Sequence, residues 1–169
     1  MKGKGLVRNP YFWSVLAIII ATIVIASATY TRFLQLHFYV GPLYFHHWLG
    51  WTGSLFIAIY TPIYHFLKRR YPARYKHLLN LHVFGNLVAF FFISVHFAQH
   101  MGRPAEFFPD LGTGLALYIT LGMLVVTGIL QRFKILEKLT SYYKFIHTGL
   151  TMTFYILIVI HILHGLEII

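Results

Sequence analysis

Five long runs without Asp, Glu, Lys or Arg dominate this sequence, and short polar or basic connections separate them. They cover residues 11–31, 44–67, 78–99, 111–131 and 145–166. A helix needs about 20 apolar residues to cross the hydrocarbon core of a bilayer. The chain is also 58% hydrophobic over 169 residues, which is more apolar than a soluble domain of this size. We therefore expect one all-α integral membrane domain over residues 1–169, with five transmembrane helices in a bundle.

The first run could instead be a secretory signal peptide, because basic residues precede it. It is too long for the apolar region of a signal, so an uncleaved membrane helix is favoured. Gly41 and Pro42 mark a turn before the second run.

The basic residues predict the orientation of the helices. Of the 14 Lys and Arg residues, only Arg32 and Arg103 lie outside the N-terminal tail and the connections after the second and fourth runs. Cytoplasmic segments of membrane proteins are enriched in Lys and Arg. We expect a multi-pass protein of the cytoplasmic membrane, with the N-terminus inside and the C-terminus outside. This placement between apolar runs also argues against a nucleic-acid-binding surface.

Two histidine pairs with equal spacing lie inside the apolar runs. His82 and His96 are fourteen residues apart in the third run, and His147 and His161 are fourteen apart in the fifth. Fourteen helical residues separate two side chains by about 21 Å and leave them within about 40° of one face. An ionisable group inside the hydrocarbon normally marks a site with a partner. These four histidines suit the axial ligands of two haems that are stacked across the bilayer.

The expected direction of the helices predicts how these ligands pair. The third and fifth helices run the same way, so His82 would pair with His147 toward the cytoplasm, and His96 with His161 toward the outside. Glycines follow two of these histidines and would leave room for a porphyrin edge; they are Gly85 and Gly149. The chain has no cysteine, which excludes iron–sulfur ligation and covalent haem attachment within it. The fourth run contains no histidine and predicts a packing helix.

The remaining histidines leave alternatives open. His47 and His65 are eighteen residues apart, as are His82 and His100, and this spacing also returns a helix to the same face. The second helix could therefore supply a haem ligand, or there could be a third haem or a metal site. Several histidines gather near the expected outer face, where they could line a quinol pocket or bind haem propionates together with Arg103. These are His46, His47, His100 and His164. Near the helix ends, His37 and His77 are expected to be interfacial.

On these four histidines the chain resembles the di-haem membrane cytochromes b. This group includes the cytochrome b subunits of respiratory complexes and the ferric-reductase-like transmembrane domains, and the position of the ligands in the third and fifth helices is closest to the latter. The resemblance implies two b-type haems and electron transfer through the bilayer. By contrast with the ferric-reductase-like branch, we expect no sixth helix and no flavin- or nicotinamide-binding domain in these 169 residues.

We therefore expect the electron-transfer subunit of an oxidoreductase complex. It would carry electrons between a quinone pool or a peripheral redox partner and an acceptor on another chain. The expected partners are the lipid bilayer and subunits that hold flavin, iron–sulfur clusters or several haems. One alternative is a stand-alone ferric-reductase-like or quinone oxidoreductase. Another is a haemless transporter or assembly protein, although no run contains a carboxylate for proton coupling.

Overall fold

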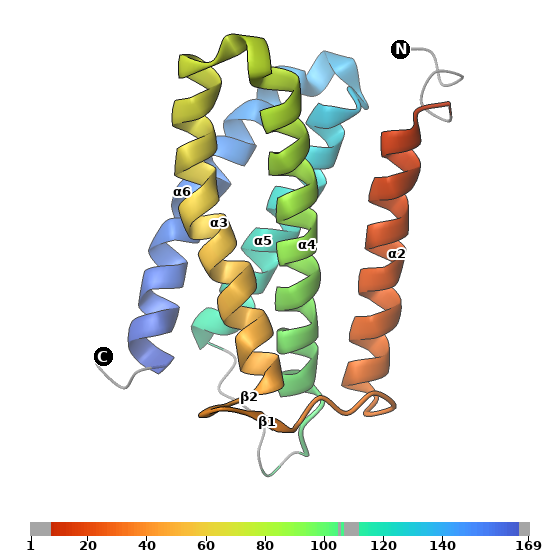
Figure 1. Cartoon of the computed structure of the whole chain (residues 1–169), viewed down its shortest axis with the longest axis vertical. Coiled ribbons are helices and arrows are strands. Elements are labelled where there is room, and N and C mark those ends of the chain that lie inside the picture. Colours follow the sequence, from red (N-terminus) through yellow and green to blue (C-terminus); the bar gives the residue numbers. More distant parts are fainter. Residues whose placement is uncertain (1–7, 105, 107–111, 166–169) are drawn as a thin grey trace. The chain divides into compact units, whose positions relative to one another are not determined.

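The computed structural model describes residues 8–104, 106 and 112–165, and most of these residues are helical (Figure 1). The long helices are α2 (Pro10–Tyr30), α3 (Phe45–Arg70), α4 (Tyr75–Met101), α5 (Gly112–Arg132) and α6 (Thr140–Gly165). Two short 3₁₀ helices, η1 (Pro72–Arg74) and η3 (Glu137–Leu139), precede α4 and α6. The predicted all-α class is confirmed, and each expected apolar run lies mostly within one of the long helices.

Four of the long helices have the length and composition to cross a membrane. These spans are Pro10–Tyr30, Pro72–Met101, Gly112–Arg132 and Glu137–Gly165. With its 26 residues, α3 is long enough, but it contains three histidines and ends in Lys68, Arg69 and Arg70, which lower its mean hydropathy. The four apolar helices indicate a multi-pass membrane protein. The fifth span and the orientation of the termini stay predictions.

A small β-hairpin before α3 was not expected from the sequence. Its strands are β1 (Tyr39–Val40) and β2 (Leu43–Tyr44), which are antiparallel and pair Val40 with Leu43. The two-residue turn between them begins at Gly41, whose φ of 62° is one that a glycine adopts without strain. The indole Nε1 of Trp48 donates to the Val40 carbonyl at 2.8 Å. This bond fastens the hairpin to the first turn of α3.

The chain divides into two compact units. One consists of Met1–Ser14 with Asp110–Ile169 and contains the pair α5 and α6; the other is Val15–Pro109 and contains the pair α3 and α4. In the second unit the backbones of α3 and α4 approach closely, because a Cβ at Gly53 would lie 2.8 Å from the Ala89 carbonyl oxygen. The prediction that residues 1–169 form one domain stays a prediction.

Candidate functional site

Within the first unit, His147 and His161 both turn toward α5. The Nδ1 of His147 lies 2.9 Å from Thr127 Oγ1, and the Nδ1 of His161 lies 3.2 Å from Thr113 Oγ1. Both rings are half-buried. The two histidines of α6 thus have equivalent partners, one near each end of α5.

A glycine follows each of these threonines and lies against the same imidazole. A Cβ added at Gly128 would lie 3.5 Å from His147 Cε1, and one at Gly114 would lie 3.3 Å from His161 Cε1. The fourth apolar run, which forms α5, therefore contains two Thr-Gly pairs, fourteen residues apart, that match the fourteen-residue spacing of the histidines. Because this run contains no histidine, its contacts with the histidines of α6 were not predicted. The repeated Thr-Gly spacing was the signal that could have revealed them.

The bond to Thr127 determines which nitrogen of His147 carries the proton. The Thr127 hydroxyl lies 2.8 Å from the Met123 carbonyl, to which it donates its single hydrogen. The hydroxyl oxygen must then accept a hydrogen bond from Nδ1–H of His147. In the neutral ring this leaves the lone pair on Nε2, the arrangement that suits a histidine ligating a metal through Nε2.

His96, in the second unit, has the same tautomer for a related reason. Its Nδ1 lies 3.0 Å from the His46 backbone carbonyl, which can only accept a hydrogen bond. Nδ1 therefore carries the proton, and the lone pair of the neutral ring is on Nε2. Gly50 makes this contact possible, since a Cβ there would lie 2.9 Å from Cγ of the His96 ring.

His82, on α4, packs between α3 and α4. Its ring stacks on buried Tyr64 with centroids 4.3 Å apart and an interplanar angle of 12°. Asn86 Nδ2 lies 3.2 Å from His82 Nδ1, while the buried Oδ1 of the same amide has no hydrogen-bond partner. Rotating the amide by 180° would place Oδ1 beside Nδ1 and allow Nδ1–H to donate, as it does in His96 and His147.

The two glycines expected to admit a porphyrin edge have different surroundings. Phe56 fills the space in front of Gly85, because a Cβ there would overlap Cζ of its ring. A macrocycle could approach Gly85 only if Phe56 changed its rotamer. No described atom lies within 4 Å of a Cβ placed at Gly149.

Around the end of α4, the second unit gathers four imidazoles, which we call the histidine cluster: His46, His47, His96 and His100. The ring centroid of His100 is 4.7 Å from that of His96, 5.1 Å from that of His46 and 5.2 Å from that of His47. Ligand nitrogens of His46, His47 and His100 all lie within 4.8 Å of one another. The sequence predicts that these three histidines gather. The fourth member expected with them, His164, is an exposed residue of the other unit.

His37 extends the histidine cluster, although its place near a helix end predicts an interfacial residue. Its ring stacks on Tyr44 at 3.9 Å and on His46 at 5.6 Å. Nothing in the sequence near His37 signals this stacking, because the hairpin brings Tyr44 back beside it. His65, the other candidate ligand of α3, is exposed near the opposite end of that helix.

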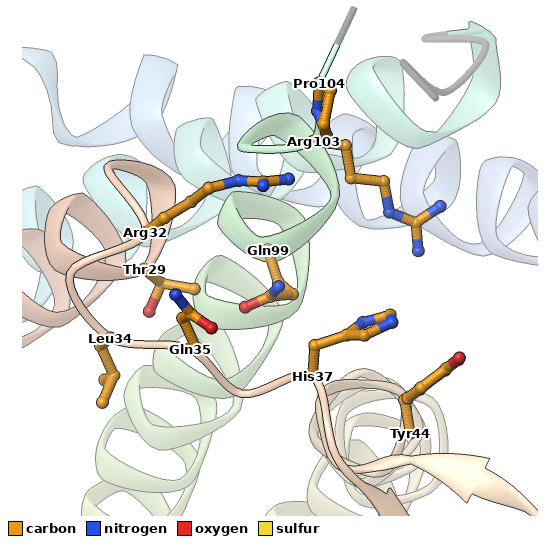
Figure 2. Close-up of a pocket in the computed structure, with 9 residues that line it drawn as sticks. All are labelled: Thr29, Arg32, Leu34, Gln35, His37, Tyr44, Gln99, Arg103 and Pro104. Carbon is orange, nitrogen blue, oxygen red and sulfur yellow. The ribbon is translucent and has the colours of Figure 1, made fainter. Parts of the chain in front are cut away.

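A pocket of about 440 Å³ lies beside His37 (Figure 2). Its polar lining includes Arg32, Arg103, His37, Tyr44 and Gln99. The Tyr44 hydroxyl can act as a hydrogen-bond donor. The two guanidinium groups make the pocket positive. It can therefore receive a polar or anionic group through several hydrogen-bond donors.

Other contacts hold this end of the second unit together. The Arg32 side chain donates to the Gly102 carbonyl, and a Cβ at Gly102 would lie 2.5 Å from the Tyr30 carbonyl oxygen. The Leu36 amide donates to the side chain of Gln99 at 3.4 Å. These bonds fix the segment between α2 and the hairpin against the end of α4.

Comparison with protein-family models, with curated proteins and with solved structures found no match.

Proposed function

We propose that this protein is a membrane-embedded di-haem b subunit that transfers electrons across the bilayer. In this proposal His82 and His147 ligate the haem toward the cytoplasm, and His96 and His161 ligate the haem toward the outside. Each pair joins one histidine from each compact unit. The proposed pairing therefore depends on the expected direction of α4 and α6 in the membrane.

The observation that carries this proposal is the hydrogen bonding of the four imidazoles. His96, His147 and His161 each place Nδ1 against an oxygen atom, and His82 places it against an amide. A histidine that ligates a metal normally donates its other ring N–H to a carbonyl, hydroxyl or carboxylate, which fixes the ring and raises its basicity. Packing between helices alone does not require histidines fourteen residues apart to share the same kind of contact at Nδ1.

The protein residues in this proposal hold and tune the cofactor. Bound haem supplies one-electron redox chemistry at its iron. Two histidine ligands leave no open coordination position, which favours electron transfer over oxygen binding. The Thr127 and Thr113 hydroxyls and the His46 carbonyl orient the ligands from α5 and α3. Phenylalanines on α4 provide a dry surrounding; they are Phe84, Phe90, Phe91, Phe92 and Phe97.

The expected outer side is where we propose that electrons enter or leave. The pocket beside His37 has several polar side chains able to hydrogen-bond the oxygens of a quinone head group, and its volume is in the range of small-molecule sites. Histidine can exchange the proton that accompanies quinol oxidation. The cytoplasmic connections carry nine Lys and Arg residues, which could also attract an acidic redox partner.

A second function, a quinone oxidoreductase that needs no other subunit, is favoured by this same pocket. The two functions differ in what the purified chain can do alone. Turnover of a water-soluble quinone at full rate without any further cofactor-bearing chain would support the second function. A chain that exchanges electrons rapidly with chemical donors, yet turns quinone over only with added partners, would support the first.

Electron transfer across a sealed vesicle tests the proposal. The purified chain is reconstituted into vesicles that contain ferricyanide, and the impermeant reductant dithionite is added outside. We expect the wild-type protein and the His77→Ala control, which changes an exposed histidine, to reduce the trapped ferricyanide. His96→Ala should slow the reaction to the rate of protein-free vesicles. A haemless transporter would give that low rate in the wild type as well, and no Soret band.

A further inference from the structure

The histidine cluster contains histidines that are not needed as ligands of the two proposed haems. Of its four members, only His96 is a proposed haem ligand. His46 and His47 begin α3, and His100 lies in the last turn of α4. We propose that His46, His47 and His100, the histidine triad, bind a zinc or copper ion.

The geometry of the histidine triad is close to that of a three-histidine metal site. One ligand nitrogen from each residue lies within 4.8 Å of the others. Imidazole nitrogens bind zinc at roughly 2.0–2.1 Å, which places them about 3.4 Å from one another around a tetrahedral ion. The rings must therefore move toward one another when the ion binds. His47 and His100 are half-buried, so an ion can reach the site.

His46 supplies an independent observation that points to a ligand. Its side chain is 0% exposed, and neither Nδ1 nor Nε2 has a hydrogen-bond partner. The Leu36 backbone is a close neighbour of the ring but does not meet hydrogen-bond geometry. A buried imidazole without partners is unfavourable, because water would bond both of its nitrogens. Coordination of an ion would satisfy one of them.

The donor set selects the class of ion. Three imidazoles, with no carboxylate or thiolate among them, suit zinc and copper and do not suit calcium or magnesium. Arg103 contributes positive charge to the surroundings of all three histidines. This charge favours an anion, such as hydroxide or chloride, as the fourth ligand of the ion.

The histidine triad is linked to a proposed haem ligand through one residue. The His46 ring would bind the ion, while the His46 carbonyl accepts the hydrogen bond from His96 Nδ1. A redox-active ion such as copper would therefore lie beside the outer haem and could exchange electrons with it. This link rests on the proposed function, whereas metal binding by the histidine triad is independent of it.

Zinc binding to the purified full-length chain tests the proposal. The protein is isolated without a polyhistidine tag, treated with a chelator and titrated with Zn²⁺, and the zinc and haem per chain are measured after gel filtration. We expect about one tightly bound zinc per wild-type chain. His47→Gln and His100→Gln should each weaken zinc binding by at least about 10- to 100-fold, the effect of losing even an outer partner of a metal ligand.

A matched control separates this site from other histidines and from the haems. His77→Gln alters an exposed histidine and should leave zinc binding unchanged. Haem content should stay at the wild-type value in all three variants, which also shows that each is folded. Equal zinc affinity in the His47, His100 and wild-type proteins would overturn the proposal. Loss of haem from either triad variant would also overturn it, by making that residue a haem ligand. A wild-type chain that binds zinc through the histidine triad but holds no haem would contradict only the proposed function.

Discussion

Thr127 illustrates how one hydroxyl can tune a proposed haem ligand. It donates to Met123 and accepts from His147 Nδ1–H, so it increases the electron density of the imidazole. An electron-rich ligand stabilises ferric over ferrous iron and lowers the reduction potential. At the scale of single residues, the oxygens that the proposed ligands contact would therefore help to set the potentials of the two proposed haems.

Replacing Thr127 by valine removes this acceptor with little change in shape. The potential of the haem ligated by His147 should rise by roughly 20–60 mV, if the lost bond contributes about 0.5–1.5 kcal/mol and a one-electron couple shifts 59 mV for each tenfold change. A potentiometric titration followed optically measures the shift. The control is Thr120→Val, which removes another buried hydroxyl of α5 that bonds the Ala116 carbonyl of its own helix. Identical potentials in the Thr127→Val variant and the wild type would contradict the role of Thr127.

Among the helices, each helix that carries the proposed haem ligands is paired with a helix that supports it. α6 has its histidines against the Thr-Gly pairs of α5, while α4 has His96 against Gly50 and the His46 carbonyl of α3. A Cβ at Gly50 would lie too close to the His96 imidazole, whereas one at Gly128 would make an ordinary contact with His147. The supporting helices therefore decide how far the ligand rings can turn.

A methyl group at Gly50 tests this support. In Gly50→Ala the new Cβ would lie 2.9 Å from His96 Cγ, so the ring must move and its bond to the His46 carbonyl must lengthen. We expect loss or altered spectra of the haem ligated by His96, with the other haem unchanged. The control Gly122→Ala adds the same methyl group on α5, where no described atom lies within 4 Å. Low-temperature spectra of the reduced proteins measure both haems, and equal spectra for the two variants would show that α3 does not position His96.

The same helices show what the sequence could and could not predict. Hydrophobic runs and histidine spacing predicted the long helices and the candidate ligands, because both depend on local pattern. The partners of the ligands depend on packing between helices. Thr127 and the hairpin contact of His37 were missed for this reason, since a threonine in an apolar run and a histidine in a loop are each common without a function.

For the whole molecule, the number of membrane crossings determines which haem faces which side. If α3 crosses the membrane with the other four helices, the strongly basic connections all lie in the cytoplasm, as the positive-inside rule favours. If α3 does not cross, the connections after α3 and α5 lie outside. Because α3 has a lower mean hydropathy than the other long helices, whether it crosses the membrane decides the topology.

Reporters at two positions distinguish these topologies. We expect a reporter inserted in the connection after Arg70 to behave as cytoplasmic and one fused after Ile169 to behave as extracytoplasmic. If α3 stays on one side, both results reverse while the N-terminus remains cytoplasmic. A protease-accessibility assay on the same fusions is an independent check, and the reversed pattern would exchange the inner and outer haems of the proposal.

Haem content combined with electron paramagnetic resonance tests whether the four histidines ligate two haems. We expect about two haems b per chain, both low-spin in the oxidised protein. His82→Ala and His147→Ala should each remove the same low-spin signal, while His96→Ala and His161→Ala should remove the other. A chain without haem, a high-spin signal in the wild type, or loss of the same signal from the His96 and His147 variants would contradict this assignment of the ligands.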